Sequence, residues 1–137
     1  IQKEQIFLLQ NDYIHYHKPI SKNDIQKEIQ KYDFSLVPLR VNIFGAFPSK
    51  ITATISSGVP VLFIGEGEGH DIVKRLGIGK SFRNVEVSKM SDFLKIYSTN
   101  RLYYKKCFAK KINLSLKGEF NYTDNVNKLN KFLTKIN

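Results

Sequence analysis

A glycine-containing loop that runs into a helix start carries the residues best suited to chemistry. Phe44-Gly45-Ala46-Phe47 is followed directly by Pro48-Ser49-Lys50, and proline suits the first position of a helix. Free amide groups at a helix N-terminus, the helix dipole and a lysine together form an anion site suited to phosphate. The alternative is that Gly45 only permits a turn and that Lys50 is solvated.

A second glycine-rich segment, Gly65-Glu66-Gly67-Glu68-Gly69, follows an apolar strand and opens a helix, as a dinucleotide-binding fingerprint does. The pattern fails at the third glycine, where His70 stands, and the carboxylates of Glu66 and Glu68 would repel a pyrophosphate. We therefore do not expect NAD binding. These carboxylates suit hydrogen bonds from the hydroxyls of a sugar, or they are simply solvated.

The other reactive side chains form no motif. Cys107 is the only cysteine, which excludes an internal disulfide and a multi-cysteine zinc site, and it has no patterned histidine partner that would make it a nucleophile. The three histidines lack metal-binding spacing. The sequence also lacks a P-loop and a Ser-His-Asp pattern. We predict no metal site and no cofactor.

Alternating strands and helices must position these loops. Strands are expected at 13–17, 34–39, 59–64 and within 80–87, and helices after Ser21, at 49–57 and at 70–76. Ser21 and Asp24 form a helix-capping pattern that turns Ile25 and Ile29 inward. The nearly continuous apolar run at 34–39 is typical of a strand covered on both faces of a parallel sheet. Residues 1–10 match the end of an amphipathic helix.

Three helical segments complete the chain. Apolar residues at helical spacing predict a packing face on each one. These residues are Met90, Phe93, Leu94 and Tyr97 in the first segment, Tyr104, Phe108, Ile112 and Leu116 in the second, and Val126, Leu129, Phe132, Leu133 and Ile136 in the third. The whole order predicts one α/β domain, 1–137: an open Rossmann-like parallel sheet with flanking helices and a helical tail.

The charge is concentrated in that tail. The 137 residues carry a formal net charge of +10. Residues 100–137 hold nine Lys or Arg against Glu119 and Asp124, a net of +7, which leaves +3 for the first 99 residues. The basic tail at 100–137 is either a solvated lysine-rich face or a surface for anionic lipid or a polyanionic substrate. Nucleic acid is not expected, because the tail aromatics fall on helical stripes and no recognition motif accompanies them.

Several stretches, in the same order along the chain, resemble the C-terminal, donor-binding half of GT-B glycosyltransferases of the group 1, family 4 kind. They are Tyr32-Asp33-Phe34-Ser35-Leu36-Val37-Pro38-Leu39, Phe47-Pro48-Ser49-Lys50-Ile51, Ser57-Gly58-Val59-Pro60-Val61-Leu62 and Gly65-Glu66-Gly67-Glu68-Gly69-His70-Asp71-Ile72-Val73. Residues 13–20 resemble the family's strand and turn, with Lys18-Pro19 in place of the glycine. Phe120-Asn121-Tyr122 resembles the closing segment, so the similarity covers nearly the whole chain.

The resemblance implies a domain that binds a nucleotide-diphosphate sugar, usually UDP-linked in relatives carrying Pro-Ser-Lys, and transfers the sugar with retention and without an obligatory metal. It implies that Lys50 and the helix amides stabilise the charge that develops on the leaving group. The donor-binding residues would be Lys18, Pro19, Ile20, Arg40, Gly45, Ala46, Phe47, Pro48, Ser49, Lys50 and Thr54, with Glu66 and Glu68 near the sugar hydroxyls. No catalytic residue is named.

The chain departs from the family at one pair of positions. The family commonly has two glutamates separated by seven residues, the second contacting ribose, and here those positions are Gly45 and Ala53. Thr52 or Thr54 can supply a substitute hydroxyl. Without that substitution, donor affinity is weakened or the protein is an inactive relative.

The chain begins at Ile1 and its only methionine is Met90, so we expect it to be incomplete at its N-terminus. It would be the last part of a two-domain enzyme, lacking the acceptor domain and inactive alone. The expected function is sugar transfer to a growing polysaccharide or a lipid-linked acceptor, in the cytoplasm and at the inner face of the membrane. The alternative is an inactive domain that docks on anionic membrane or polymer through its basic tail. A nucleotide-sugar epimerase lacks support, because the expected acidic and histidine residues are not seen.

Overall fold

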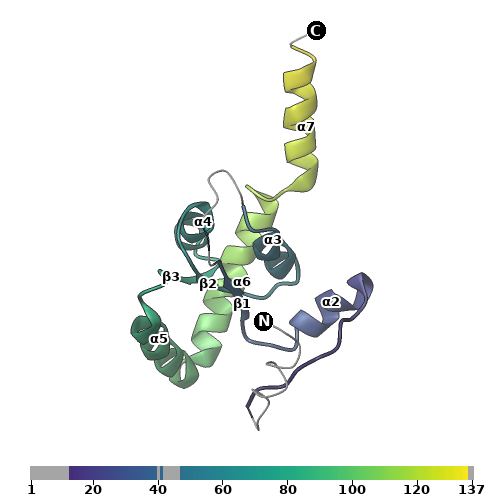
Figure 1. Cartoon of the computed structure of the whole chain (residues 1–137). Coiled ribbons are helices and arrows are strands. Elements are labelled where there is room, and N and C mark those ends of the chain that lie inside the picture. Colours follow the sequence, from purple (N-terminus) through teal and green to yellow (C-terminus); the bar gives the residue numbers. More distant parts are fainter. Residues whose placement is uncertain (1–12, 40, 42–46, 136–137) are drawn as a thin grey trace.

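The computed structural model describes residues 13–39, 41 and 47–135 (Figure 1). The elements follow in the order α2 (Lys22–Ile29), β1 (Ser35–Pro38), α3 (Ser49–Ser56), β2 (Val61–Ile64), α4 (Glu68–Leu76), β3 (Gly79–Phe82), α5 (Val87–Thr99), α6 (Arg101–Lys117) and α7 (Tyr122–Leu133). The fold is therefore α/β with a helical C-terminal part, as the alternation of apolar patterns predicts.

The three strands form one parallel sheet in the order β1-β2-β3. The central strand is the most buried, with Val61 and Phe63 fully inaccessible to solvent. Figure 1 shows α3 and α4 on one side of the sheet and α5 on the other. A small parallel sheet with helices on both faces is consistent with a Rossmann-like arrangement.

The main core lies between the sheet and helices α3, α4 and α6. Ile51 and Ile55 of α3 and Val73 of α4 are fully buried against β2, and Ile112 of α6 closes the same cluster. The predicted packing face of α6 is confirmed, because Ile112 and Phe108 are both buried.

An aromatic cluster fills the opposite face of the sheet. It consists of Phe34, Phe82, Phe93, Tyr97, Tyr104 and Phe108, packed mostly edge to face or tilted, together with Leu62 and Met90. Phe93 and Tyr97 come from the predicted packing face of α5. Leu94 was expected on that face too, but 37% of it is exposed, because α5 turns it away from the sheet.

The first strand is less covered than its apolar run predicts. Val37 is buried, but Leu36 on the other face is 54% exposed. In the described chain β1 is an edge strand, and the helices on the aromatic side cover Leu62 and Phe82 of the neighbouring strands without reaching Leu36. The prediction of a strand covered on both faces is therefore wrong for β1.

The region before β1 also differs from expectation. Residues 13–17 do not form a strand, since Ile14 alone takes part in a single bridge. Helix α2 is capped as predicted, with the Asp24 amide donating to the Ser21 hydroxyl at 3.2 Å. However, Ile25 is 44% exposed, because α2 meets α3 through glutamine side chains instead. The helix expected at 1–10 lies outside the described residues.

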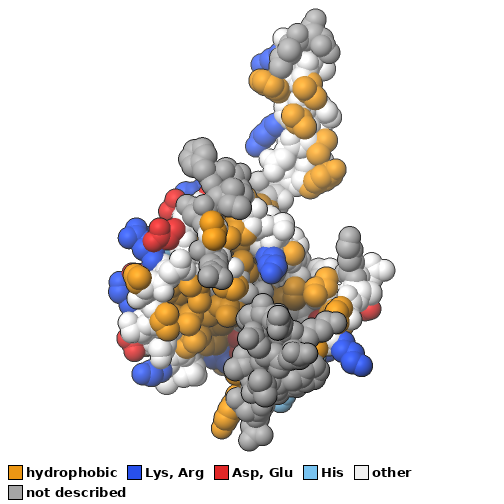
Figure 2. Space-filling model, viewed as in Figure 1, with side chains coloured by type: hydrophobic (Ala, Val, Ile, Leu, Met, Phe, Trp, Pro, Cys, Tyr) orange, Lys and Arg blue, Asp and Glu red, His pale blue; other side chains and the backbone are white. Residues whose placement is uncertain are grey.

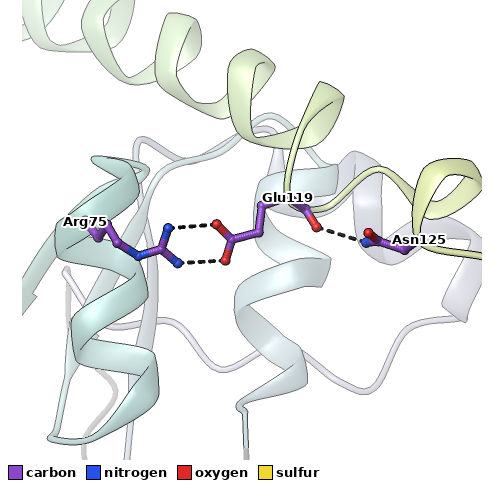
Figure 3. A network of polar contacts seen from close by, with 3 residues as sticks. All are labelled: Arg75, Glu119 and Asn125. Atoms are coloured by element: carbon purple, nitrogen blue, oxygen red, sulfur yellow. Dashed lines mark hydrogen bonds and ion pairs between the residues drawn. The ribbon is translucent and has the colours of Figure 1, made fainter. Parts of the chain in front are cut away.

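Helix α7 projects away from the body of the molecule (Figure 1). None of its described residues is buried. Of the packing face predicted for it, Leu129, Phe132 and Leu133 are exposed and Val126 is only partly buried, while Ile136 lies outside the described residues. Hydrogen bonds connect α4, the turn before α7 and the first turns of α7, as Figure 3 shows. The Arg75 guanidinium donates two hydrogen bonds to the Glu119 carboxylate, at 2.8 and 2.7 Å, and the Asn125 amide donates to the Glu119 carbonyl at 2.9 Å.

Candidate functional site

The start of α3 follows the loop after β1, where the sequence predicts a phosphate site. The helix begins at Ser49, as the expected range 49–57 has it, and Pro48 is its N-cap rather than its first residue. No side chain caps the helix, and the Ile51 amide donates to the Pro48 carbonyl at 2.9 Å. Ser49 and Lys50 are both exposed. An uncapped helix N-terminus with an exposed lysine in its first turn can bind an anion.

The loop after β2 starts beside the loop after β1. The Leu39 amide donates to the Ile64 carbonyl at 2.7 Å, and a Cβ added to Gly65 would lie 2.9 Å from the Cβ of Leu39. Glu66 and Glu68 follow, both exposed. Glu68 lies in the first turn of α4, where the helix dipole favours a carboxylate. The two predicted loops therefore leave the same edge of the sheet.

Some of the predicted site residues in α3 and just before it lie at the surface, and others lie in the interior. Phe47 is partly buried and packs on the core beside Phe120, with ring centroids 6.1 Å apart. Thr54 is only 2% exposed, so its hydroxyl faces the interior. Thr52 is less buried, and its hydroxyl donates to the Ser49 carbonyl at 2.8 Å. Of the two threonines considered as ribose partners, Thr52 is the one nearer the surface.

The structure does not bring the remaining predicted donor-binding residues together with the start of α3. Lys18, Pro19 and Ile20 are exposed in an irregular segment before α2. Within the described ranges, no hydrogen bond joins this segment to the start of α3, and α2 itself is bonded to the C-terminal end of α3. Arg40, Gly45 and Ala46 lie outside the described residues.

Sequence reasoning missed a pocket of about 550 Å³ beside β3. Its lining comes from α4, β3, the turn after β3, the start of α5 and the middle of α6. The residues are His70, Lys74, Gly77, Gly79, Lys80, Ser81, Phe82, Arg83, Glu86, Lys89, Tyr103, Tyr104, Cys107, Phe108 and Lys111. His70 follows the second glycine-rich segment and lies in α4, where its Nδ1 is 2.6 Å from the Ser81 hydroxyl. No motif marks the other residues, because they are dispersed over 38 positions of the chain from Lys74 to Lys111.

A separate cluster of charges ties α6 to the start of β1. The Asp33 carboxylate accepts hydrogen bonds from the Arg101 guanidinium at 3.0 and 3.1 Å and pairs with the Lys105 ammonium at 2.7 Å. Partial burial of Asp33 opposes ionisation, but the bonds from Lys105 and Arg101 outweigh it and lower the pKa of Asp33. This cluster is structural: the single charge of Asp33 pairs with two cations of the basic tail and leaves the group with a net charge of +1.

Comparison with known protein families, characterised proteins and solved structures finds no match to this chain. Within residues 13–39, 41 and 47–135, no helix is long and apolar enough to cross a membrane. The same residues contain no group of three or more His, Cys, Asp or Glu that could hold a metal ion.

Proposed function

We propose that this chain is the donor-binding domain of a GT-B glycosyltransferase and binds a nucleotide-diphosphate sugar, UDP-linked, for retaining transfer to a polysaccharide or lipid-linked acceptor. One observation carries the proposal. The N-terminus of α3, the helix that follows strand β1 of the parallel sheet, is uncapped and presents Lys50 in its first turn. Ligands of open parallel sheets bind beyond the carboxyl ends of the strands, and phosphates bind at helix N-termini.

The second loop fits the same proposal. It leaves the sheet beside the first one and carries two exposed carboxylates, Glu66 and Glu68. Carboxylates accept hydrogen bonds from sugar hydroxyls, whereas they repel phosphates. The diphosphate would therefore lie over the start of α3, with the sugar turned toward Glu66 and Glu68. Thr52 is the better placed substitute for the missing ribose-binding glutamate, since Thr54 is buried.

Thermal unfolding of the chain with UDP-glucose, UDP-galactose and UDP-N-acetylglucosamine tests this proposal. A ligand at ten times its Kd stabilises the folded state by about 1.4 kcal/mol, which raises the Tm by about 4–6 °C for a chain of this size. Lys50→Ala should abolish the shift, while Lys110→Ala, an exposed lysine of α6, should retain it. If no nucleotide sugar changes the Tm, the donor site is wrong.

A second candidate function, docking on an anionic membrane, is favoured by the surface of α7. Its hydrophobic side chains are exposed, with Tyr122 at 81%, Leu129 at 55%, Phe132 at 61% and Leu133 at 50%. Figure 2 shows these side chains along the length of α7 with lysines beside them. A helix with an apolar stripe and flanking lysines is typical of segments that lie in the interface of anionic bilayers.

Co-sedimentation with vesicles tests the membrane proposal. The chain should bind vesicles that contain phosphatidylglycerol, should not bind pure phosphatidylcholine, and should be released by high salt because screening weakens the lysine contacts. Phe132→Ser with Leu133→Ser should reduce binding, whereas Leu102→Ser, an exposed leucine on α6, should not. Equal binding by the α7 variant would contradict the role of this helix. Lipid binding together with no response to any UDP-sugar would favour the inactive docking domain over the transferase.

A further inference from the structure

The pocket beside β3 gathers basic side chains from five separate parts of the chain. Lys74 comes from α4, Lys80 from β3, Arg83 from the turn after β3, Lys89 from α5 and Lys111 from α6. These residues are not neighbours on one helix face, so their convergence does not follow from a solvated lysine stripe. The fold brings them around one cavity.

The pocket lining contains a single carboxylate, and that carboxylate is already hydrogen-bonded. Glu86 is the one carboxylate among the lining residues, and it accepts hydrogen bonds from the Lys89 ammonium at 2.6 Å and from the Arg83 backbone amide at 2.9 Å. The Lys89 bond, and then the Arg83 amide, lower the pKa of Glu86. The described residues provide no carboxylate ion pair to Lys74, Lys80, Arg83 or Lys111. Clefts lined by one sign of charge attract ligands of the other sign.

The charges are distributed along the whole strand. Lys111 lies at the amino end of β3, where its Cγ is 3.6 Å from the position of a Cβ on Gly77. Arg83 follows the other end, and each residue of a strand advances the chain by about 3.3 Å. The four residues of β3 therefore separate the two ends by about 13 Å, a span that favours a ligand longer than a single small anion. The arrangement calls for a ligand with several negative groups in a row.

The walls between the basic groups are apolar and aromatic. Phe82, Tyr104 and Phe108 line the pocket, and the Lys80 ammonium lies 5.4 Å from the centre of the Phe93 ring. A volume of about 550 Å³ is within the range of small-molecule sites. We propose that this pocket binds a small polyanion that carries a linear chain of phosphates. The site is distinct from the proposed donor site and does not depend on it.

Cys107 provides a direct reporter, because it is the only cysteine, lies in the wall of the pocket and is partly exposed. The rate at which neutral iodoacetamide alkylates Cys107 in the full chain is measured by mass spectrometry, with added sodium tripolyphosphate or ATP. Both probes should slow the reaction in a saturable manner. Equal protection by the two means that the phosphate chain alone is recognised, and tighter protection by ATP means that the aromatic wall contributes to binding.

Matched variants separate a built site from general attraction by a basic protein. Lys80→Gln with Arg83→Gln should raise the concentration needed for half protection about tenfold, because charge-assisted hydrogen bonds are lost. Lys110→Gln with Lys128→Gln removes the same charge outside the pocket and should change it less than about twofold. Circular dichroism checks that each variant is folded.

Three results would overturn the proposal. The first is that neither probe slows the alkylation of Cys107. The second is an equal loss of protection in the pocket variant and in the control variant, since binding would then follow net charge. The third is loss of protection on Lys50→Ala, which would place the phosphates at α3. Failure of the UDP-sugar experiment leaves these outcomes unaffected, because Lys50 does not line this pocket.

Discussion

Replacement of Gly79 by alanine tests the packing that forms both the sheet and the pocket. A Cβ at this position would lie 1.9 Å from the carbonyl oxygen of Val61 and 2.7 Å from its carbonyl carbon and its nitrogen. Real Cβ atoms essentially never approach closer than 3.0 Å, and the contacts are with backbone rather than with a flexible side chain. The strands β2 and β3 must therefore separate by about 1 Å.

The cost follows from the bonds that this separation breaks. The Val61 amide donates to the Ile78 carbonyl at 3.1 Å, so an added 1 Å or so takes this bond beyond hydrogen-bond range. Loss of about two ladder bonds at about 1 kcal/mol each, with overpacking of about 1–3 kcal/mol, gives a destabilisation of about 3–5 kcal/mol. Urea unfolding followed by circular dichroism should show a midpoint lower by about 2–3 M, for a slope of about 1.5 kcal/mol/M.

Gly58→Ala is the matched control. Gly58 has a φ of +75°, but a Cβ there meets no atom within 4 Å, so only backbone strain of about 1 kcal/mol is expected. A Gly79→Ala variant that is already unfolded without urea agrees with the reasoning. A Gly79→Ala variant no less stable than Gly58→Ala would refute it, because the close contact between β2 and β3 could not then exist.

Three further predictions concern stability. The bonds from Lys105 and Arg101 lower the pKa of Asp33 below its usual value of 3.8. The ionised carboxylate therefore stabilises the fold above pH 3.8, and this contribution is lost as the pH falls through the lowered pKa. In acid unfolding, Asp33→Asn should accordingly lose less stability below about pH 4 than the wild type does. Ile112→Ala, at a side chain only 1% exposed, should cost about 3 kcal/mol in urea unfolding, and a cost below about 1 kcal/mol would place α6 outside the core. Phe132→Ser should change stability by less than about 0.5 kcal/mol, because this side chain is 61% exposed on α7, and a larger loss would mean that the helix packs on the domain.

The sequence predicts the helices and strands well where local signals and burial agree. Ser21 caps α2, Gly58 follows α3 and Gly77 ends α4, each at or within a residue of the expected place. The buried run before Gly65 is the central strand. Periodicity does not reveal which apolar faces find a partner, and for this reason Leu36 and the stripe of α7 are exposed against expectation.

The candidate sites likewise differ in whether a local sequence signal predicts them. A helix start with proline and lysine is a local signal, and α3 begins there within one residue. The pocket beside β3 has no local signal, because its basic residues come from separate elements and meet only when α4 and α6 pack beside the strand. Thr54 shows the converse, since its place within the predicted helix at 49–57 did not disclose that it is buried.

The basic tail is not a single surface, although its net charge of +7 suggests one. Arg101 and Lys105 are paired with Asp33, Lys111 lines the pocket beside β3, and Lys128 and Lys131 lie on the projecting helix α7. A partner that binds α7 therefore need not compete with a ligand of the pocket. Substitutions on α7 should remove lipid binding and leave the protection of Cys107 intact, because no α7 residue lines that pocket. Loss of both together would show instead that charge alone, and not the arrangement of these elements, governs binding.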